Sequence, residues 1–121
     1  MIERIIKEGS RAFLVRNMND GDGCLFDIYK GPIYRLYDDQ GNLWMTVAVR
    51  RQLYHGTVVT DVASGLMVIA CTGAKSYNDA VHDISRQYES INKAMTTGFY
   101  ENAVKLCQAE YAELRERGVL K

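Results

Sequence analysis

The order of the periodic segments constrains the fold of this chain more than any other feature. Residues 11–71 alternate apolar and polar side chains in short runs separated by Gly, Asn and Asp, which is typical of half-buried β-strands. Residues 77–117 change to apolar side chains spaced three and four apart, which indicates amphipathic helices. Strands followed by helices predict an α+β fold, and 121 residues predict a single domain over 1–121.

The predicted sheet is an antiparallel meander of about six strands. Pro32 separates the second strand from the third, because proline removes a donor from the ladder. Gly65 is expected in the left-handed conformation, in a three-residue loop between the last two strands. The expected strands are 11–16, 24–29, 33–38, 43–50, 57–62 and 66–71.

A hairpin that pairs Tyr37 with Trp44 sorts the neighbouring side chains onto two faces. The more apolar face is expected to meet the helices, and it holds Tyr34, Leu36, Leu43, Met45, Val47 and Val49. The other face is amphipathic and holds Ile33, Arg35, Tyr37, Trp44, Thr46 and Ala48.

The helical pair is predicted as a C-terminal hairpin over 77–117. Ser76 is expected to cap the first helix, with Asp79 near its positive end. The second helix is expected over Phe99–Arg117, and Gly118 ends it.

Composition restricts the cellular location and the binding partners that we expect for this protein. Lys+Arg and Asp+Glu both number 15, and this balance argues against general nucleic-acid binding. No apolar run approaches the ~20 residues of a membrane span, and the charged N-terminus holds no signal-peptide core. The odd and widely spaced Cys24, Cys71 and Cys107 predict reduced thiols and a cytoplasmic protein.

The strand from Met67 to Cys71 is apolar on both faces. Helices on one side of a sheet would leave the other face of this strand uncovered. We therefore expect a homo-oligomer with this strand at the interface.

Residues with catalytic chemistry do not form a recognisable set. His82 and Asp83 are adjacent on the expected helix, so their side chains diverge by about 100°. Cys71 lies in an apolar strand, where a thiol is less acidic. No spacing of Cys and His fits zinc. We expect no enzyme activity, no metal and no cofactor.

The connection from Arg50 to Gly56 is the best candidate for a ligand site. Arg50 and Arg51 offer forks that match phosphate, and Tyr54 and His55 offer faces that stack on a base. The alternative is a solvated hairpin tip.

A second candidate site lies at the start of the first helix. Lys75 and Ser76 stand there beside exposed amides that suit an anion. The alternative is an ordinary capped helix start.

In layout, the strand-rich residues 11–71 followed by the helix pair from Ser76 to Arg117 resemble the phage anti-Thoeris sponge proteins. These are small cytosolic oligomers that sequester cyclic ADP-ribose signals and cyclic nucleotides without cleaving them. The resemblance covers most of the chain as architecture and transfers no binding residue.

The function expected from these observations is non-catalytic binding of a phosphate-bearing cyclic nucleotide or ADP-ribose-like signal. The alternative is an inhibitor or adaptor that binds a host protein through the amphipathic sheet face.

Overall fold

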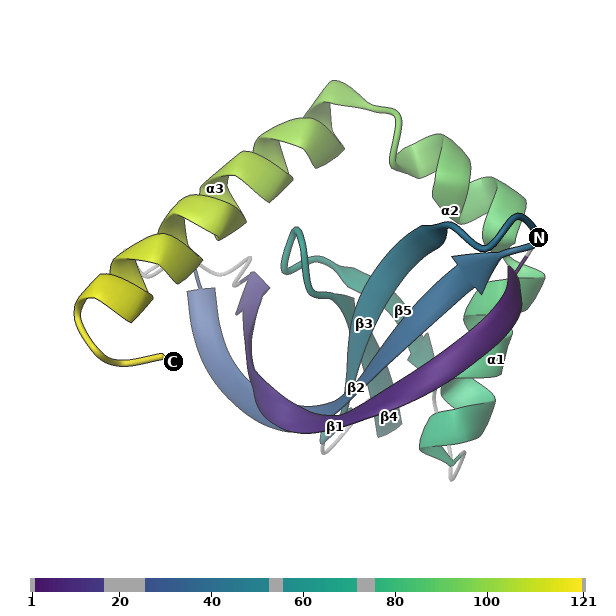
Figure 1. Ribbon diagram of the computed structural model, residues 1–121, viewed down its shortest axis with the longest axis horizontal. Coiled ribbons are helices and arrows are strands. Elements are labelled where there is room, and N and C mark those ends of the chain that lie inside the picture. Colours follow the sequence, from purple (N-terminus) through teal and green to yellow (C-terminus); the bar gives the residue numbers. More distant parts are fainter. Residues whose placement is uncertain (1, 17–25, 53–55, 72–75, 121) are drawn as a thin grey trace.

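The computed structural model describes residues 2–16, 26–52, 56–71 and 76–120, and Figure 1 shows their arrangement. Within them, five strands form one antiparallel sheet in chain order, and three helices follow. The strands are β1 (Ile2–Arg16), β2 (Phe26–Asp38), β3 (Leu43–Gln52), β4 (Gly56–Asp61) and β5 (Met67–Cys71). The helices are α1 (Tyr77–Arg86), α2 (Tyr88–Ala94) and α3 (Gly98–Glu116). The predicted α+β class and antiparallel meander are therefore confirmed.

The described residues hold five strands instead of six, because two predicted strands join into β2. Pro32 lies inside β2, opposite Ser10 of β1. The ladder between β2 and β3 begins only at Ile33. Pro32 therefore lies beyond that ladder, where a missing amide donor breaks no bond to β3. β1 is also longer than predicted, since it already begins at Ile2.

The ribbon formed by β1 and β2 bends strongly in its middle (Figure 1). Its pairing register shifts between Lys7 and Ser10, and Gly9 between them has a positive φ of 95°. A bulge of this kind bends a strand and increases its twist. The part of the ribbon beyond the bend, residues 10–16 of β1 with 26–32 of β2, is called the distal arm below.

Gly31 lets the distal arm leave the sheet close to β3. A Cβ atom at this position would collide with the carbonyl oxygen of Val49. Only a residue without a side chain permits two backbones to approach so closely. The path of the arm thus depends on Gly9 at the bulge and on Gly31 at the crossing.

The sheet face beneath α1 is the face that the sequence predicted to meet the helices. Ala80, Val81 and Ile84 of α1 pack on it, and all three are fully buried. Five of the predicted face residues belong to this cluster, namely Tyr34, Leu36, Met45, Val47 and Val49.

Leu43 and Trp44 were assigned to the wrong faces. The register shifts by one residue at this hairpin, so that Tyr37 pairs with Leu43 rather than with Trp44. Leu43 is consequently 51% exposed. The Trp44 ring lies 4.7 Å from the ring of Tyr88, and its indole nitrogen donates to Asn92 Oδ1 at 3.2 Å. One inserted residue reverses the alternation of every side chain beyond it.

The predicted helical hairpin is observed only in part. The first predicted helix is divided at Gln87, whose φ of −106° and ψ of 19° interrupt it between α1 and α2. Helix α3 extends to the distal arm instead of lying along α1 (Figure 1). Its apolar stripe is buried there, because Cys107, Tyr111 and Leu114 cluster with Leu14 and Phe26. None of the helices in the described ranges is long and apolar enough to cross a membrane.

The turn between β4 and β5 closes the sheet onto the distal arm. Gly65 in this turn has a φ of 74°, which confirms the predicted left-handed conformation. Its carbonyl oxygen accepts a hydrogen bond from the amide of Arg16 at 2.7 Å. A Cβ on Gly65 would lie 3.2 Å from that amide nitrogen and 3.3 Å from the Phe26 ring. The close approach therefore requires glycine.

Strand β5 is where the sequence predicts a subunit interface. Met67 is 60% exposed, which is consistent with an apolar side chain left for a partner. The side chains of residues 69–71 lie outside the described part of the chain. Self-association through this strand stays a prediction.

Candidate functional site

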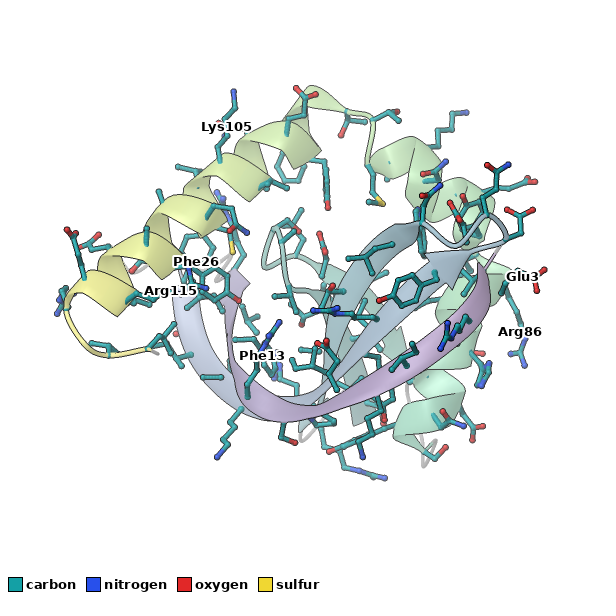
Figure 2. All side chains as sticks on the ribbon, in the orientation of Figure 1. Glu3, Phe13, Phe26, Arg86, Lys105 and Arg115 are labelled. Carbon is teal, nitrogen blue, oxygen red and sulfur yellow. The ribbon has the colours of Figure 1, made fainter. Side chains whose placement is uncertain are left out.

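A groove of about 630 Å³ lies between the distal arm and α3. Its polar lining comes from β1, β2 and α3, and Val62, Val119 and Leu120 add apolar surface. We call it the basic groove; its polar and charged lining residues are Ser10, Arg11, Lys30, Gln108, Tyr111 and Arg115. Figure 2 shows Phe26 and Arg115 where α3 meets the arm, and Lys105 pointing outward from the helix.

Three basic residues from three different elements border the groove. Arg11 lies on β1, Lys30 on β2 and Arg115 on α3. The described lining residues include no aspartate or glutamate. In the described part of the chain, the arginines that form ion pairs are Arg35 with Glu8, Arg86 with Asp83 and Arg117 with Glu113. Among the described residues the groove therefore offers basic side chains without a paired carboxylate, which suits an anion.

Tyr111 forms the inner wall of the groove and holds the arm to the helix. Its hydroxyl oxygen accepts a hydrogen bond from the Leu14 amide at 2.9 Å. The guanidinium carbon of Arg115 lies 5.5 Å from the centre of the tyrosine ring, within range of a cation–π contact. Burial raises the pKa of Tyr111, while the Leu14 amide and then the charges of Arg11 and Arg115 oppose that rise. The ring therefore stays neutral beside both cations.

The end of α3 shapes the remaining wall. Gly118 has a φ of 75°, a conformation that commonly ends a helix and was predicted here. The chain then turns back, so that the amides of Val119 and Leu120 both donate to the Leu114 carbonyl oxygen, at 2.9 and 3.3 Å. Leu120 packs against the cluster beneath α3. This turn places two apolar side chains beside the cations.

Arg50 and Arg51, both predicted as ligand residues, lie on opposite faces of β3. The Arg50 guanidinium stacks over the Tyr29 ring at 4.2 Å, and that of Arg51 lies 5.8 Å from the centre of the Tyr77 ring. Consecutive side chains of a strand point in opposite directions. The structure therefore does not bring these two arginines together on one ligand.

Of the other predicted site residues, Tyr54, His55 and Lys75 lie outside the described residues. The Ser76 hydroxyl oxygen accepts a hydrogen bond from the Asp79 amide at 3.1 Å, which confirms the predicted helix cap. This contact engages the Ser76 side chain in capping. Anion binding at the start of α1 stays a prediction.

Cys107 is buried beneath α3 and forms no disulfide with any described residue. Burial, reinforced by the nearby Asp61 charge, raises the pKa of its thiol to about 12. A buried thiol of this kind is poorly nucleophilic, which suits a core side chain. Cys24 and the side chain of Cys71 lie outside the described part of the chain. Within that part, no group of three His, Cys, Asp or Glu residues could hold a metal ion.

Arg11 and Lys30 were not among the predicted site residues. Both are isolated basic residues in strand patterns, and basic residues on strands are usually solvated. Their position beside the same groove as Arg115 depends on the bend in β1 and on the path of α3. The bulge glycine was the only local signal of that bend.

Comparisons with protein-family models, curated proteins and solved structures found no match to this chain.

Proposed function

We propose that the protein binds a phosphate-bearing, nucleotide-like molecule without converting it, and that the basic groove holds this ligand. The observation that carries the proposal is that Arg11, Lys30 and Arg115, none of them ion-paired among the described residues, all border one groove. Guanidinium groups bind phosphate through paired, charge-assisted hydrogen bonds. The chain as a whole carries no net charge, so the positive character of the groove is local.

The apolar part of the groove supports a ligand larger than a free phosphate ion. Its volume of about 630 Å³ falls within the usual range for small-molecule sites. Val62, Val119 and Leu120 offer contact surface for a base or a sugar beside the cations. A nucleotide combines these two chemistries in one molecule.

The resemblance in layout to phage sponge proteins suggests the biological role. We propose that the protein sequesters a nucleotide signal in the cytoplasm as a homo-oligomer and releases it unchanged. In this role the arginines at positions 50 and 51 would form separate anion contacts, because they face away from each other.

The alternative, a protein-binding inhibitor that uses the amphipathic sheet face, has less support. Ile33 and Ala48 of that face are buried in a cluster with Phe13 and Val15. Trp44, its largest aromatic side chain, packs toward the helices instead. Arg35, Tyr37 and Thr46 of this face stay partly exposed, so the surface left for a partner is smaller and more polar than the sequence predicted.

The experiment is a thermal-shift titration with ATP, ADP and cyclic AMP, with adenosine as the ligand that lacks phosphate. At 100 times its dissociation constant a ligand adds about 2.7 kcal/mol to the free energy of unfolding. We expect a shift with the phosphorylated compounds and little with adenosine. We also expect the recovered nucleotide to be chemically intact.

Matched variants locate the site. Arg115→Ala should weaken binding about tenfold or more, because a charge-assisted contact contributes about 1.5–3 kcal/mol. Arg117→Ala removes the same charge two residues away, where the guanidinium pairs with Glu113 at 3.9 Å, and should leave binding unchanged. Lys30→Ala and Lys105→Ala form a second pair, since Lys105 points away from the arm (Figure 2). If both variants of each pair weaken nucleotide binding equally, the basic groove is not the binding site.

A further inference from the structure

A second and smaller pocket of about 140 Å³ lies where the β4–β5 turn meets α2 and the start of α3. Three methionines, Met45, Met67 and Met95, line it together with Ile91 and Ala94. We call it the methionine pocket. Its residues differ from those of the basic groove, so it does not depend on the function proposed above.

The polar groups of the methionine pocket are already engaged with one another. Asp61 Oδ2 accepts hydrogen bonds from the hydroxyls of Ser64 and Tyr100, at 2.7 Å each. Asp61 Oδ1 accepts from the Ala63 amide at 3.3 Å. Ser64 Oγ in turn accepts from the Leu66 amide at 3.2 Å. An occupant therefore gains no free hydrogen-bonding partner from these groups, which favours an apolar molecule over a polar one.

The methionines make the pocket adaptable. Met45 is buried and forms the inner end, whereas Met67 is 60% exposed and stands at the mouth. Unbranched, polarisable thioether side chains adjust to the shape of an occupant and make favourable contacts with aromatic rings.

We propose that the methionine pocket is a binding site for a small apolar ring of about the size of benzene. An engineered apolar cavity of about 150 Å³ in another protein accepts benzene, and the pocket described here has nearly that volume. The volume, the methionine lining and the internally satisfied polar groups all favour the same occupant. The site would thus recognise the apolar ring of a small molecule.

The test uses the full chain labelled with ¹³C at its methionine methyl groups and titrated with benzene. Saturable shifts of the Met45 and Met95 signals are expected, together with a rise in melting temperature. Phenol, which adds a hydroxyl to the same ring, should bind more weakly than benzene. Binding of phenol as tight as that of benzene would overturn the apolar assignment.

Ala94 lines the pocket at an exposed position, so Ala94→Phe brings a ring to its mouth and should weaken benzene binding at least tenfold. Lys93→Phe adds the same ring at the neighbouring exposed position of α2 and should leave binding unchanged. The absence of saturable shifts in the unmodified chain, or equal weakening by both variants, would overturn the proposal. So would a dimer that Ala94→Phe dissociates, because a second copy would then occupy the pocket. None of these outcomes bears on the basic groove.

Discussion

Helix α1 covers its part of the sheet with Ala80, Val81 and Ile84, whereas α3 holds the distal arm with a mixture of apolar packing and hydrogen bonds. Around α3, the Tyr111 hydroxyl accepts a hydrogen bond from the Leu14 amide, and the Tyr100 hydroxyl donates one to the Asp61 carboxylate. The amide nitrogen of the Gln108 side chain adds a bond to the Ala63 carbonyl oxygen at 3.0 Å.

The difference follows from what each helix covers. Beneath α1, strands β3 and β4 pair without a register shift, so that apolar side chains suffice to cover them. Helix α3 instead meets a bent ribbon and a tight turn, which present backbone groups that need partners. The region held by more side-chain hydrogen bonds is also the region that forms the basic groove. The stability of the region near α1 should therefore depend on the volume of its buried apolar side chains. The stability of the region near α3 should depend on individual hydrogen bonds.

The largest expected effect tests the apolar side of this comparison. Ile84→Ala should lower the free energy of unfolding by about 2–5 kcal/mol, because Ile84 is fully buried and its truncation leaves a cavity. Chemical denaturation measures the loss. His82→Ala on the exposed side of α1 should change stability by no more than about 0.5 kcal/mol. Similar losses of unfolding free energy in both variants would mean that the volume of buried side chains does not determine stability here.

A smaller effect tests the polar side. Tyr111→Phe keeps the ring but removes the acceptor for the Leu14 amide, so stability should fall by about 1–3 kcal/mol. Hydrogen exchange of the Leu14 amide should accelerate more than exchange in β3. Tyr88→Phe is the matched control, since Tyr88 contacts Trp44 through its ring. If the exchange rate of the Leu14 amide is unchanged in Tyr111→Phe, the Tyr111 hydroxyl does not hold the distal arm to α3.

The smallest effect concerns the pH dependence of Asp61 beside α3. Burial raises its pKa above the ordinary value of 3.8, and the hydrogen bonds from Ser64 and Tyr100 oppose only part of that rise. The folded state therefore binds the proton more tightly than the unfolded state does. The stability that Asp61 contributes is complete below pH 3.8 and is lost as the pH rises through the folded pKa.

Comparison with Asp61→Asn isolates this contribution. The difference in unfolding free energy, wild type minus variant, should fall as the pH rises from about 3.8 and then level off. Urea denaturation across this pH range provides the measurement. A difference that grows with pH would show that the hydrogen bonds outweigh the cost of burial.

Local features were predictable from the sequence because their causes lie within a few residues. The left-handed Gly65, the Ser76 cap and the Gly118 helix end depend only on turn chemistry. The face beneath α1 followed from strict alternation along β2 and β3. The faces of Leu43 and Trp44 were missed because the hairpin inserts one residue.

The candidate site was less predictable because its parts are distant in sequence. Arg11, Lys30 and Arg115 border one groove only because β1 bends at Gly9 and α3 reaches the arm. No periodicity encodes that encounter. Arg50 and Arg51 illustrate the opposite error, since neighbours in a strand are close in sequence and yet face apart.

The bond from Leu14 to Tyr111 joins residues separated by 97 positions. Such a contact requires closure of nearly the whole chain, which costs more conformational entropy than the closure of any hairpin. We expect the distal arm and α3 to dock late in folding, after the meander and α1 have formed. During synthesis the arm leaves the ribosome long before its covering helix exists. Until α3 follows, the apolar face around Leu14 and Phe26 is open to solvent or to chaperones.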